Sequence, residues 1–414
     1  MGRERGILVV DVGTTKVCAL IGEEKEEKLW VTGMGIAPSR GLKKGTIINI
    51  DEATQSIKEA IEKAQSQAKV SIESIYTSIA GSHIKTLSSS GVVALKEKIV
   101  TPAEVEEVLY SAQAVELPQD RTILHVIPQE FIVDQARGII QPVGMSGVRL
   151  EAHVRLITCN RSNLQNLLRC FENLDLEVDG VIFQGLASGE GVLTSEEKEL
   201  GVILIDLGGG TTDVAIYWDN VLRYVFSLPV GGELLTNDLA VGLRTSRKEA
   251  EKLKIENGVC VRELVDDEEI IEVPGIGDRP PKKVNKKILA EILEPRIREL
   301  FELIEKELQA QTLYEEDIID IKSKAGSGIV ITGGSALLPG IIYLAEQIFN
   351  LPARIGYPLK LAGLAEETYH PQFATSVGML SYVYSGLKEK IKEDKKERLI
   401  EKLKKSFLKF IKGG

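Results

Sequence analysis

Short apolar runs separated by glycine turns and polar residues recur along the chain. Residues 7–10 form such a run, which ends at Asp11, and a second apolar run begins at Val17 after a glycine and two threonines. A polar turn over residues 23–28 leads into a third run. Apolar runs of about four to eight residues bounded by turn residues are typical of strands. The pattern predicts three consecutive strands joined by tight turns.

The same order of features returns in the second half of the chain. The segment ILIDLGGGTTDVAIY, residues 203–217, again has an apolar run that ends at an aspartate, a turn rich in glycine and threonine, and a second apolar run. A polar pair, Asp219 and Asn220, precedes the third run. The two aspartates at the turns, Asp11 and Asp206, lie about 195 positions apart. Such self-similarity indicates a duplicated fold.

Segments with helical spacing follow each set of strands. Residues 50–68 place apolar side chains three and four positions apart, and Asp51 is a suitable N-cap. Residues 233–256 repeat this pattern and are expected to form a helix. Strands alternating with helices in two similar halves predict an α/β protein with a cleft between two lobes.

Composition and length fit a soluble protein of several domains. The 414 residues include 43% hydrophobic and 27% charged side chains, and this length suggests about two to four domains. The net charge of −10 argues against general nucleic-acid binding. The four cysteines contain no CxxC pair and are expected to be reduced thiols, and the four scattered histidines show no metal-ligand spacing. No run reaches the roughly 18 apolar residues of a membrane-spanning helix, so we expect a cytosolic protein unless another segment anchors it.

The duplicated glycine turns suit phosphate binding. A glycine-rich turn after a strand exposes backbone N–H groups, and a phosphate can approach closely because no Cβ atoms intrude. Threonine hydroxyls add donors, and Asp11 and Asp206 are suited to hold a hydrated Mg²⁺ that bridges phosphate oxygens. One such turn is common in ordinary hairpins. Two of them facing each other would hold a triphosphate from both sides.

A third glycine turn follows the strand-like run at residues 328–332. The sequence continues with Gly333, Gly334 and Ser335 and then with an amphipathic segment. A Gly-Gly pair at such a turn can lie flat against a purine ring or an α-phosphate. An ordinary strand-to-helix turn is the alternative.

Taken in this order, the motifs DVGTTK, DLGGGTTD and TGGSALLPG resemble the actin-like ATPase superfamily. Within it, the chain is similar to the FtsA family of bacterial cell-division proteins, through SRGLKKGTIINIDEA, GGELLTNDLAVGLRTSRKEAEKLK, LPARIGYP and HPQFATSVGML. The resemblance covers essentially the whole chain. It implies an α/β, actin-like two-lobed ATPase fold with duplicated RNase H-like cores and an inserted small α+β subdomain. GLASGEGVL and FATSVGML resemble the two hinge helices, where small residues let helices cross closely.

The resemblance also implies domain boundaries. An inserted subdomain is expected over residues 85–159, with a helix that begins near Thr101 and Pro102. The other expected parts are a first lobe core (1–84, 160–198 and 360–388), a second lobe core (199–233 and 321–359), a small subdomain of the second lobe (234–320), and a linker with an amphipathic helix (389–414).

Family motifs transferred to this sequence imply a site for ATP and Mg²⁺. Asp11 and Asp206 would lie near Mg²⁺ and hold it through water. Arg247, Glu251 and Lys254 are spaced to reach the ribose or the base, and a solvated helix face is the alternative. The other implied nucleotide contacts are Gly13, Thr14, Thr15 and Lys16 from one lobe, Gly208, Gly209, Gly210, Thr211, Thr212 and Gly232 from the other, and Gly333, Gly334 and Ser335 beside the adenosine.

One position departs from the family pattern. Hydrolysing relatives place a glutamate at the start of the first hinge motif, where it orients the attacking water, and the matching residue here is Gln184. A glutamine can orient water but cannot act as a base. With Gln184 and Asp206 as the catalytic candidates, we expect ATP binding with slow or absent hydrolysis. Glu190 is a weaker candidate for the role of the glutamate.

The chain ends in a basic amphipathic segment. Between Lys395 and Lys412 there are eight Lys or Arg and two Glu, so this segment carries +6 and the rest of the chain −16. Such a helix is suited to lie in a membrane interface on anionic lipid. A helix packed on the protein's own acidic surface, or bound in a partner's groove, is the alternative. The apolar face would comprise Leu399, Ile400, Leu403, Phe407, Phe410 and Ile411.

By resemblance, the protein is expected on the cytoplasmic face of the cell membrane at midcell. There it would assemble into filaments, recruit later division proteins and bind the C-terminal peptide of the tubulin-like division protein FtsZ. Arg296 and Arg298 fall in the matching part of the peptide site, and surface charges balanced by Glu294 and Glu299 are the alternative. Competing functions are a sugar kinase, a chaperone-type ATPase and a pilus adaptor of the PilM type, and the basic tail argues against the last of these.

Overall fold

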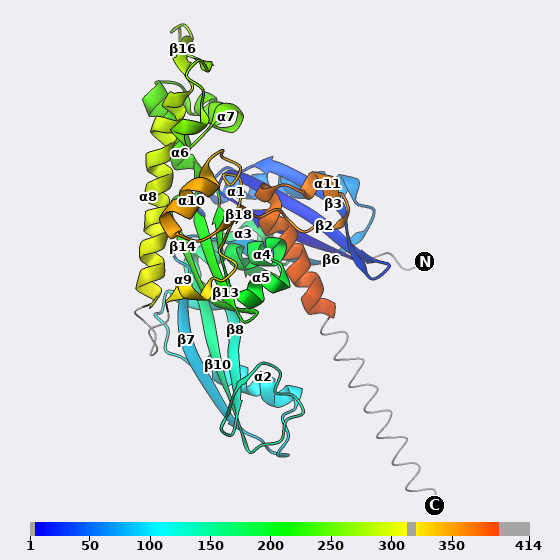
Figure 1. Ribbon diagram of the computed structural model, residues 1–414. Coiled ribbons are helices and arrows are strands. Elements are labelled where there is room, and N and C mark those ends of the chain that lie inside the picture. Colours follow the sequence, from blue (N-terminus) through cyan, green and yellow to red (C-terminus); the bar gives the residue numbers. More distant parts are fainter. Residues whose placement is uncertain (1–4, 313–319, 389–414) are drawn as a thin grey trace, which may run out of the picture.

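The computed structural model describes residues 5–312 and 320–388 of the chain (Figure 1). The first lobe is built on a six-stranded sheet, in the order β11 (Gly180–Phe183), β6 (Ser71–Ile79), β1 (Arg5–Val12), β2 (Lys16–Lys25), β3 (Lys28–Pro38) and β19 (Ala362–Gly363). Strands β1, β2 and β3 pair antiparallel, whereas β6 is parallel to β1 and β11 to β6. The three consecutive strands expected from the sequence are confirmed.

The second lobe repeats this topology. Its five-stranded sheet has the order β14 (Val221–Leu228), β13 (Thr212–Trp218), β12 (Val202–Leu207), β17 (Ile329–Thr332) and β18 (Ala353–Ile355). Three antiparallel strands are again followed by two parallel ones. The register places Asp11 opposite Cys18 and Asp206 opposite Asp213. The predicted duplication is therefore confirmed strand by strand.

The first long helix, α1 (Ile50–Gln67), packs on β2 and β3 and beside α3 (Arg161–Glu172). The helix occupies the predicted segment, but the predicted N-cap was wrong. Asn49 is the cap, because its side-chain oxygen accepts the N–H of Glu52 at 3.2 Å. Asp51 lies in the first turn instead, where a negative charge faces the positive end of the helix dipole.

Two helices cross closely between the lobes. They are α4 (Gln184–Val192) and a helix over residues 374–388. A Cβ on Gly378 would lie 1.7 Å from the carbonyl oxygen of Ala187, and one on Gly191 would lie 2.4 Å from that of Ala374. The close crossing predicted from the small residues is thus present.

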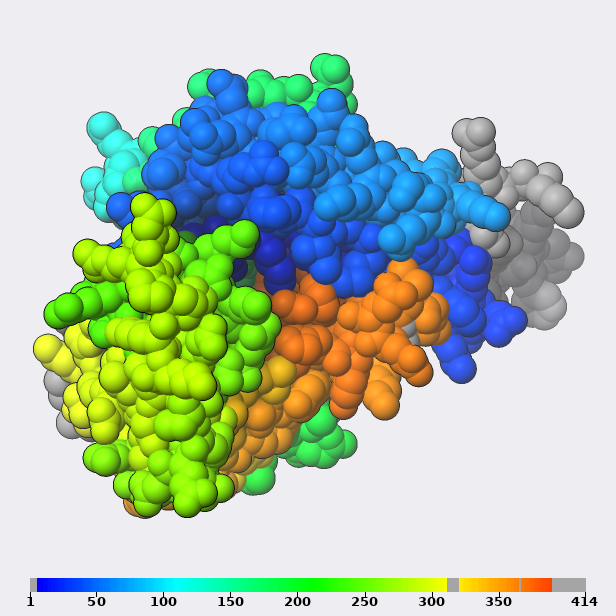
Figure 2. Space-filling model, turned by 90° about the horizontal axis from the view of Figure 1, so that it is seen from above, coloured from blue at the N-terminus to red at the C-terminus, as the bar shows by residue number. Residues whose placement is uncertain are grey.

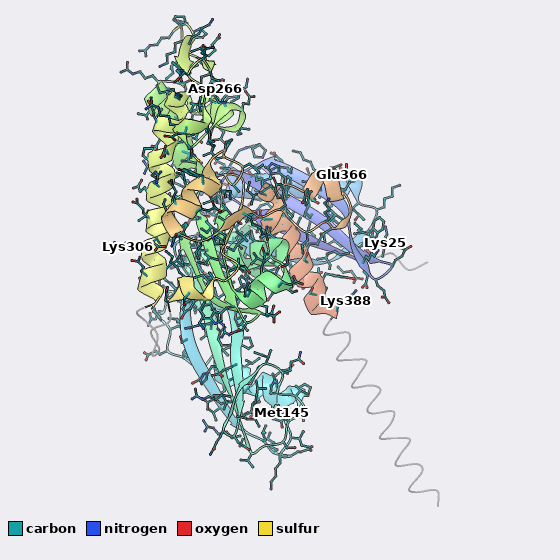
Figure 3. The ribbon with its side chains drawn as sticks, viewed as in Figure 1. Lys25, Met145, Asp266, Lys306, Glu366 and Lys388 are labelled. Carbon is teal, nitrogen blue, oxygen red and sulfur yellow. The ribbon has the colours of Figure 1, made fainter. Side chains whose placement is uncertain are left out.

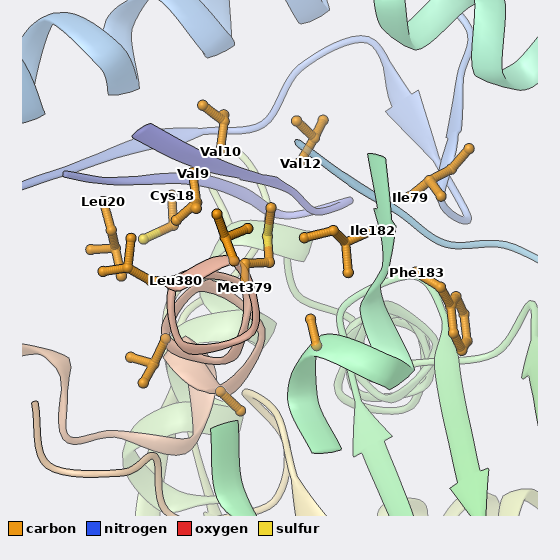
Figure 4. Packing of buried hydrophobic residues seen from close by; sticks show 14 of the residues in the cluster. Val9, Val10, Val12, Cys18, Leu20, Ile79, Ile182, Phe183, Met379 and Leu380 are labelled. Atoms are coloured by element: carbon orange, nitrogen blue, oxygen red, sulfur yellow. The ribbon is translucent and has the colours of Figure 1, made fainter. Parts of the chain in front are cut away.

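Two large apolar cores stabilise the lobes. In Figure 4, Met379 and Leu380 of the helix over 374–388 point towards Cys18 and Leu20 of the first sheet. This first core also contains Leu204 on β12, so it extends from one lobe into the other. The second core lies on the opposite face of the second sheet, against the long helix α8 (Lys287–Thr312) and α10 (Ile341–Phe349).

A separate antiparallel sheet is inserted between β6 and α3. Its order is β7 (Lys85–Ala94), β10 (Arg149–Asn160), β8 (Arg121–Val133) and β9 (Ala136–Ile139). Helix α2 (Pro102–Ser111) packs against it and begins where the sequence predicted, with Thr101 and Glu104 forming a capping box. This unit extends away from the lobes, and Met145 lies near its far end (Figures 1 and 3).

A small helical subdomain extends the second lobe in another direction. It contains α6 (Gly232–Leu243), α7 (Arg247–Asn257), most of α8, and a hairpin of β15 (Ile270–Val273) and β16 (Lys282–Asn285). The sequence predicted one helix over residues 233–256, and this was wrong. Arg244 adopts a positive φ of 52°, and Ser246 caps a new helix by accepting the N–H of Glu249.

The remaining elements are short. None of the helices within 5–312 and 320–388 has the length and apolar character needed to cross a membrane. The short elements are β4 (Leu42–Lys43), β5 (Thr46–Ile47), α5 (Ser195–Leu200), α9 (Ile321–Lys324), α11 (Ala365–Thr368), η1 (Arg262–Leu264) and η2 (Pro371–Phe373).

Candidate nucleotide-binding site

A cavity of about 550 Å³ opens between the lobes. Figure 2 shows the recess from above, between the blue N-terminal lobe and the green part of the second lobe. Residues 13–16 line it from the first lobe, residues 208–211 and 333–335 from the second, and side chains of α7 from one end. The three glycine turns meet here because each follows a central strand of one of the duplicated sheets.

The first-lobe turn is closed by its own backbone. The N–H of Gly13 donates to the carbonyl of Lys16 at 3.0 Å, and the Thr14 hydroxyl accepts the N–H of Gly45 at 3.0 Å. The ammonium of Lys16 lies 3.7 Å from the carboxylate of Asp11 and is 23% exposed. This turn therefore presents one cation to the cavity beside an acidic strand end.

The second-lobe turn touches the first. A Cβ on Gly209 would lie 2.4 Å from the Thr15 side chain, and one on Gly210 would lie 2.4 Å from the Thr14 hydroxyl. Only glycine allows this approach. The N–H groups of Gly232 and Glu233, at the start of α6, donate to the carbonyls of Gly208 and Gly209 and brace the turn from behind.

Aspartates stand at both strand ends. Asp11 accepts the Ser78 hydroxyl at 2.8 Å and the Gln184 amide at 3.0 Å. Asp206 accepts the hydroxyls of Ser188 and Thr375, and burial raises the pKa of its carboxyl. Within the described residues, no group of three or more His, Cys, Asp and Glu side chains forms a metal-ligand set. A divalent cation here would need water and phosphate oxygens to complete its shell.

A third buried carboxylate, that of Asp213, was missed by the sequence reasoning. Burial, together with the charge of the neighbouring Asp206, raises its pKa to about 7. Its Oδ1 atom has no hydrogen-bond partner among the described residues. The alignment of the two repeats could have drawn attention to Asp213. It occupies in the second repeat the position of Cys18 in the first, and each of these residues pairs with the strand-end aspartate of its own repeat.

The third glycine turn forms a flat wall of the cavity. Gly333 has a φ of 90°, and a Cβ on it would lie 2.4 Å from the Asp206 carboxylate. Around Gly334 there is open space, with nothing within 4 Å of a built Cβ. Ser335 donates its N–H to Leu207 at 3.3 Å. The adjoining apolar side chains of Leu337, Leu338 and Ile255 also line the cavity.

Three residues of helix α7 were predicted to contact the nucleotide, and two of them line the cavity. The ammonium of Lys254 donates to the Gly232 carbonyl (3.0 Å), the Thr236 hydroxyl (2.9 Å) and the Glu251 carboxylate (2.8 Å). Lys254 and Glu251 both line the cavity. The side chain of Arg247 is 63% exposed, lies 3.8 Å from Glu233, and is not among the lining residues.

Thr212 also lies outside the cavity lining. It is the first residue of β13, it is fully buried, and its hydroxyl donates to the Val230 carbonyl at 2.7 Å. The family resemblance implied that it contacts the nucleotide together with the glycine turn. In the duplicated register, however, it pairs with Leu207 as a ladder residue.

Gln184 lines the cavity and donates its side-chain amide to three acceptors. These are Asp11 at 3.0 Å, the Val12 carbonyl at 3.3 Å and Ser78 at 3.0 Å. The weaker candidate, Glu190, is paired with Lys198 at 2.7 Å and is not a lining residue. Of the two, only Gln184 is close to the strand-end aspartates.

The segment before the second hinge helix and the first turn of that helix supply residues that the sequence reasoning did not select. His370, Gln372 and Thr375 line the cavity. Burial lowers the pKa of His370, and the charge of Lys16 lowers it further. These residues fall within the motif HPQFATSVGML, but the sequence reasoning used that motif only for the family resemblance and the hinge helix and not for the cavity.

The two arginines proposed for partner binding lie on α8. Arg296 pairs with Asp238 on α6 at 2.6 Å and also with Glu299. Arg298 pairs with Glu294 at 2.9 Å and donates to Gln347 at 3.0 Å. The six apolar residues proposed for membrane contact, between Leu399 and Ile411, lie outside the described residues.

Sequence comparisons identify close relatives. The family model described as "Cell division protein FtsA" matches residues 203–378, and the one described as "SHS2 domain inserted in FTSA" matches residues 81–158. The chain is 44% identical to the cell division protein FtsA of Pseudomonas aeruginosa, over 91% of this chain and 88% of that protein. It is 38% identical to the cell division protein FtsA of Escherichia coli K12, over 91% of this chain and 90% of that protein.

Solved structures with low identity share the fold. The PilM-PilN type IV pilus biogenesis complex matches with a TM-score of 0.61 and 14% identity, over 91% of this chain and 98% of that chain. MreB5 of Spiroplasma citri bound to ADP matches with a TM-score of 0.54 and 14% identity, over 93% of this chain and 98% of that chain. These likenesses confirm the predicted actin-like two-lobed α/β fold.

Proposed function

Because the chain belongs to the FtsA family of cell division proteins, we propose that it binds ATP with Mg²⁺ between its lobes and attaches the FtsZ ring to the cytoplasmic membrane. The observation that carries the nucleotide part is the contact between two equivalent glycine turns, one from each lobe, at the mouth of one cavity. A ligand with several phosphates would meet backbone donors from both turns at once.

The residues of the cavity fit this ligand. Lys16 and the turn at 208–211 would hold phosphates, and the open space around Gly334 beside Leu337 would admit a flat base. Lys254 and Glu251 also line the cavity and would contact the ribose. Asp11 and Asp206, each of which accepts hydrogen bonds from neutral side chains, would suit a hydrated Mg²⁺. Bound there, Mg²⁺ would neutralise phosphate charge.

Hydrolysis is proposed to be slow or absent. The amide of Gln184 already donates to three acceptors and cannot take a proton from water. In this proposal, ATP acts mainly as a ligand that fixes the arrangement of the lobes. Its bound state would favour assembly of the protein into filaments.

Membrane attachment is proposed to come from the last residues of the chain. The described part ends at Lys388, which contacts Glu24 and the carbonyl of Glu27 on the β2–β3 hairpin. In Figure 3, Lys388 and Lys25 lie on the same side of the molecule. The basic segment that follows would bind anionic lipid by charge and by its apolar residues, and so place the protein on the cytoplasmic face of the membrane at midcell.

Partner binding completes the proposal. The C-terminal peptide of FtsZ would dock near Arg296 and Arg298 on α8, and later division proteins would contact the inserted subdomain. A pilus adaptor of the PilM type is the weaker alternative, since the likeness to the PilM-PilN complex is limited to 14% identity.

Co-sedimentation with anionic liposomes tests the tethering function. The full chain is compared, with and without ATP, with a chain ending at Lys392 and with a Phe407→Glu, Phe410→Glu variant as a matched control. We expect only the unmodified full chain to pellet with lipid, and we expect it to pellet more strongly with ATP. Equal pelleting of all three proteins, or of none, would refute the tail as the membrane anchor.

A further inference from the structure

The inserted subdomain contacts both lobes, although the chain connects it only to the first. Strand β7 follows β6 of the first lobe, and β10 leads directly into α3. Yet β7, β8 and β10 all pack against β14 of the second lobe. The subdomain therefore bridges the two halves of the molecule.

Side chains of the subdomain bond to the outer edge of β14. The Thr86 hydroxyl donates to the Val225 carbonyl at 3.0 Å, and the Gln129 amide donates to the Leu222 carbonyl at 2.9 Å. Strand β14 is the last strand of its sheet, and edge carbonyls need partners when they are covered. Thr86 and Gln129 supply these partners in place of another strand.

An arginine and an apolar patch strengthen this contact. The guanidinium of Arg155 donates to the Tyr224 hydroxyl at 3.0 Å and lies 4.6 Å from the centre of that ring. Leu222 and Val225 are 5% and 4% exposed and belong to the first core, together with Ile157 of β10. The interface thus combines buried apolar side chains with hydrogen bonds at its edge.

The first lobe is contacted at the start of its hinge helix. The N–H of Phe183 donates to Nε2 of His125, on β8, at 3.0 Å. Phe183 is the N-cap residue of α4, and the next residue, Gln184, bonds to Asp11 in the cavity. Strand β8 of the subdomain therefore bonds to the residue that directly precedes Gln184, which lines the cavity.

The contact with β14 is also close to that site. Strand β14 pairs with β13, which begins directly after the second glycine turn. After β14 the chain passes Val230, whose carbonyl accepts the Thr212 hydroxyl, and reaches Gly232 in the cavity wall. Both subdomain contacts thus lie on segments next to residues that line the cavity, Gln184 in one case and Gly232 in the other.

We propose that the inserted subdomain is a strut that couples the closure of the lobes on nucleotide to its own orientation, an inference that rests on the proposed ATP site. Rotation of the lobes about the crossing helices would move β14 relative to β11. The bonds of Thr86, Gln129 and Arg155 would then break, or the subdomain would turn with β14. Because such coupling is reciprocal, a partner bound to the subdomain would change the affinity for ATP.

The direction of the coupling follows from the contacts. The strut is fully bonded in an arrangement in which the two glycine turns touch. A nucleotide held by both turns needs that same arrangement. The strut and the nucleotide therefore favour the same state, and loosening the strut weakens ATP binding.

A double variant, Thr86→Val with Gln129→Met, tests this in the full chain. Neither residue lines the cavity. The matched control is Ser89→Ala on the same strand, whose hydroxyl bonds only within the subdomain, to the carbonyl of Ala112 at 2.6 Å. Calorimetric titration with MgATP should show a Kd raised about fivefold or more in the double variant and close to wild type in the control. Hydrogen exchange of β7, β8 and β10 should respond to ATP in the wild type and lose this response in the double variant.

The possible outcomes distinguish failure of the proposed strut from failure of the proposed nucleotide site. If the wild type binds ATP and the double variant matches it in both Kd and exchange, the strut is refuted and the nucleotide site stands. If the wild type binds no ATP, the proposed site fails and the strut with it. Should the double variant not fold, Arg155→Lys, which keeps the charge and loses the planar contact with Tyr224, is held to the same two measurements.

Discussion

Neutral hydrogen-bond donors surround the two strand-end aspartates. Ser78 and Gln184 donate to Asp11, and Ser188 and Thr375 donate to Asp206. Donors stabilise a buried carboxylate without adding a proton-accepting group. At the scale of single residues, Asp11 and Asp206 are therefore held in place by hydrogen bonds from these side chains.

The role of Gln184 gives a first prediction. Replacing Gln184 with Ala removes the amide that would orient water. It also removes one of the hydrogen bonds that Asp11 accepts. Any ATP turnover of the wild type should fall by at least about tenfold, a modest share of what a positioned group contributes. Phosphate release under single-turnover conditions measures it, with Glu190→Ala as the control that should change little. Unaffected turnover in Gln184→Ala would remove this residue from the chemistry.

His125 gives a second prediction, which concerns stability and pH. Burial lowers the pKa of His125 to about 4 from the usual 6.5, so the ring is neutral in the folded state at neutral pH and accepts the N–H of Phe183. The unfolded chain takes up the proton first as the pH falls. His125 therefore contributes stability that is complete above about pH 6.5 and is lost between about 6.5 and 4.

The variant His125→Gln keeps an acceptor and does not titrate. Between pH 7 and pH 4, the wild type should lose roughly 2 kcal/mol more unfolding free energy than this variant. Urea unfolding at several pH values measures the difference between the two. Parallel stability curves would show that His125 does not stay neutral in the folded protein.

At the scale of elements, the crossing of two helices governs how the lobes meet. The backbones of α4 and of the helix over 374–388 touch at Gly378 and Gly191. Close backbone packing leaves no room for a methyl group, and the neighbouring atoms are carbonyls that cannot rotate away. A glycine in an uncrowded part of a helix has no such packing role, and there it only lowers the stability of the helix.

This contrast predicts opposite effects of one substitution on one helix. Gly378→Ala should lower the unfolding free energy by about 2 kcal/mol or more, because its Cβ would overlap the Ala187 carbonyl. Gly386→Ala, at a position with nothing within 4 Å, should raise it by roughly 0.5 to 1 kcal/mol. Chemical denaturation of both variants makes the test, and equal effects would contradict the close crossing.

At the scale of the whole molecule, charge is divided unevenly along the chain. The segment from Lys395 to Lys412 carries +6, and the remainder carries −16. An anionic membrane repels the acidic body and attracts the basic end. A membrane-bound protein would therefore keep its body in water. The long helix α8 lies at the edge of this body, with Arg296 and Arg298 among many carboxylates.

The proposed FtsZ contact is a prediction at this scale. Arg296→Glu should weaken binding of the C-terminal FtsZ peptide roughly tenfold, the effect of losing one charge-assisted bond of about 1.5 kcal/mol. Fluorescence anisotropy with a labelled peptide measures it, and Lys306→Glu on the same helix is the control. Because Arg296 also pairs with Asp238, thermal unfolding must show that the variant is folded. An unchanged peptide affinity would exclude Arg296 from the contact.

The sequence by itself determined the repeated units and their turns. Apolar runs, glycine turns and aspartates recur at fixed order, and local backbone preference then leaves few alternatives for each strand and hairpin. It also determined most helix positions, although Asn49 replaced Asp51 as a cap and a break at Arg244 divided one expected helix. These errors arose because neighbouring polar residues compete as caps, and only packing selects among them.

Only the tertiary structure decided which residues share the cavity. Asp213, His370 and Thr375 reach it because strand register and the path of the later loops bring them there, whereas Arg247 and Thr212 point elsewhere. The contact of the inserted subdomain with β14 has no sequence signature at all, since it joins residues more than 90 positions apart through side-chain bonds to backbone carbonyls. Such contacts depend on the geometry of the assembled chain, because any sequence offers equivalent carbonyls at every residue.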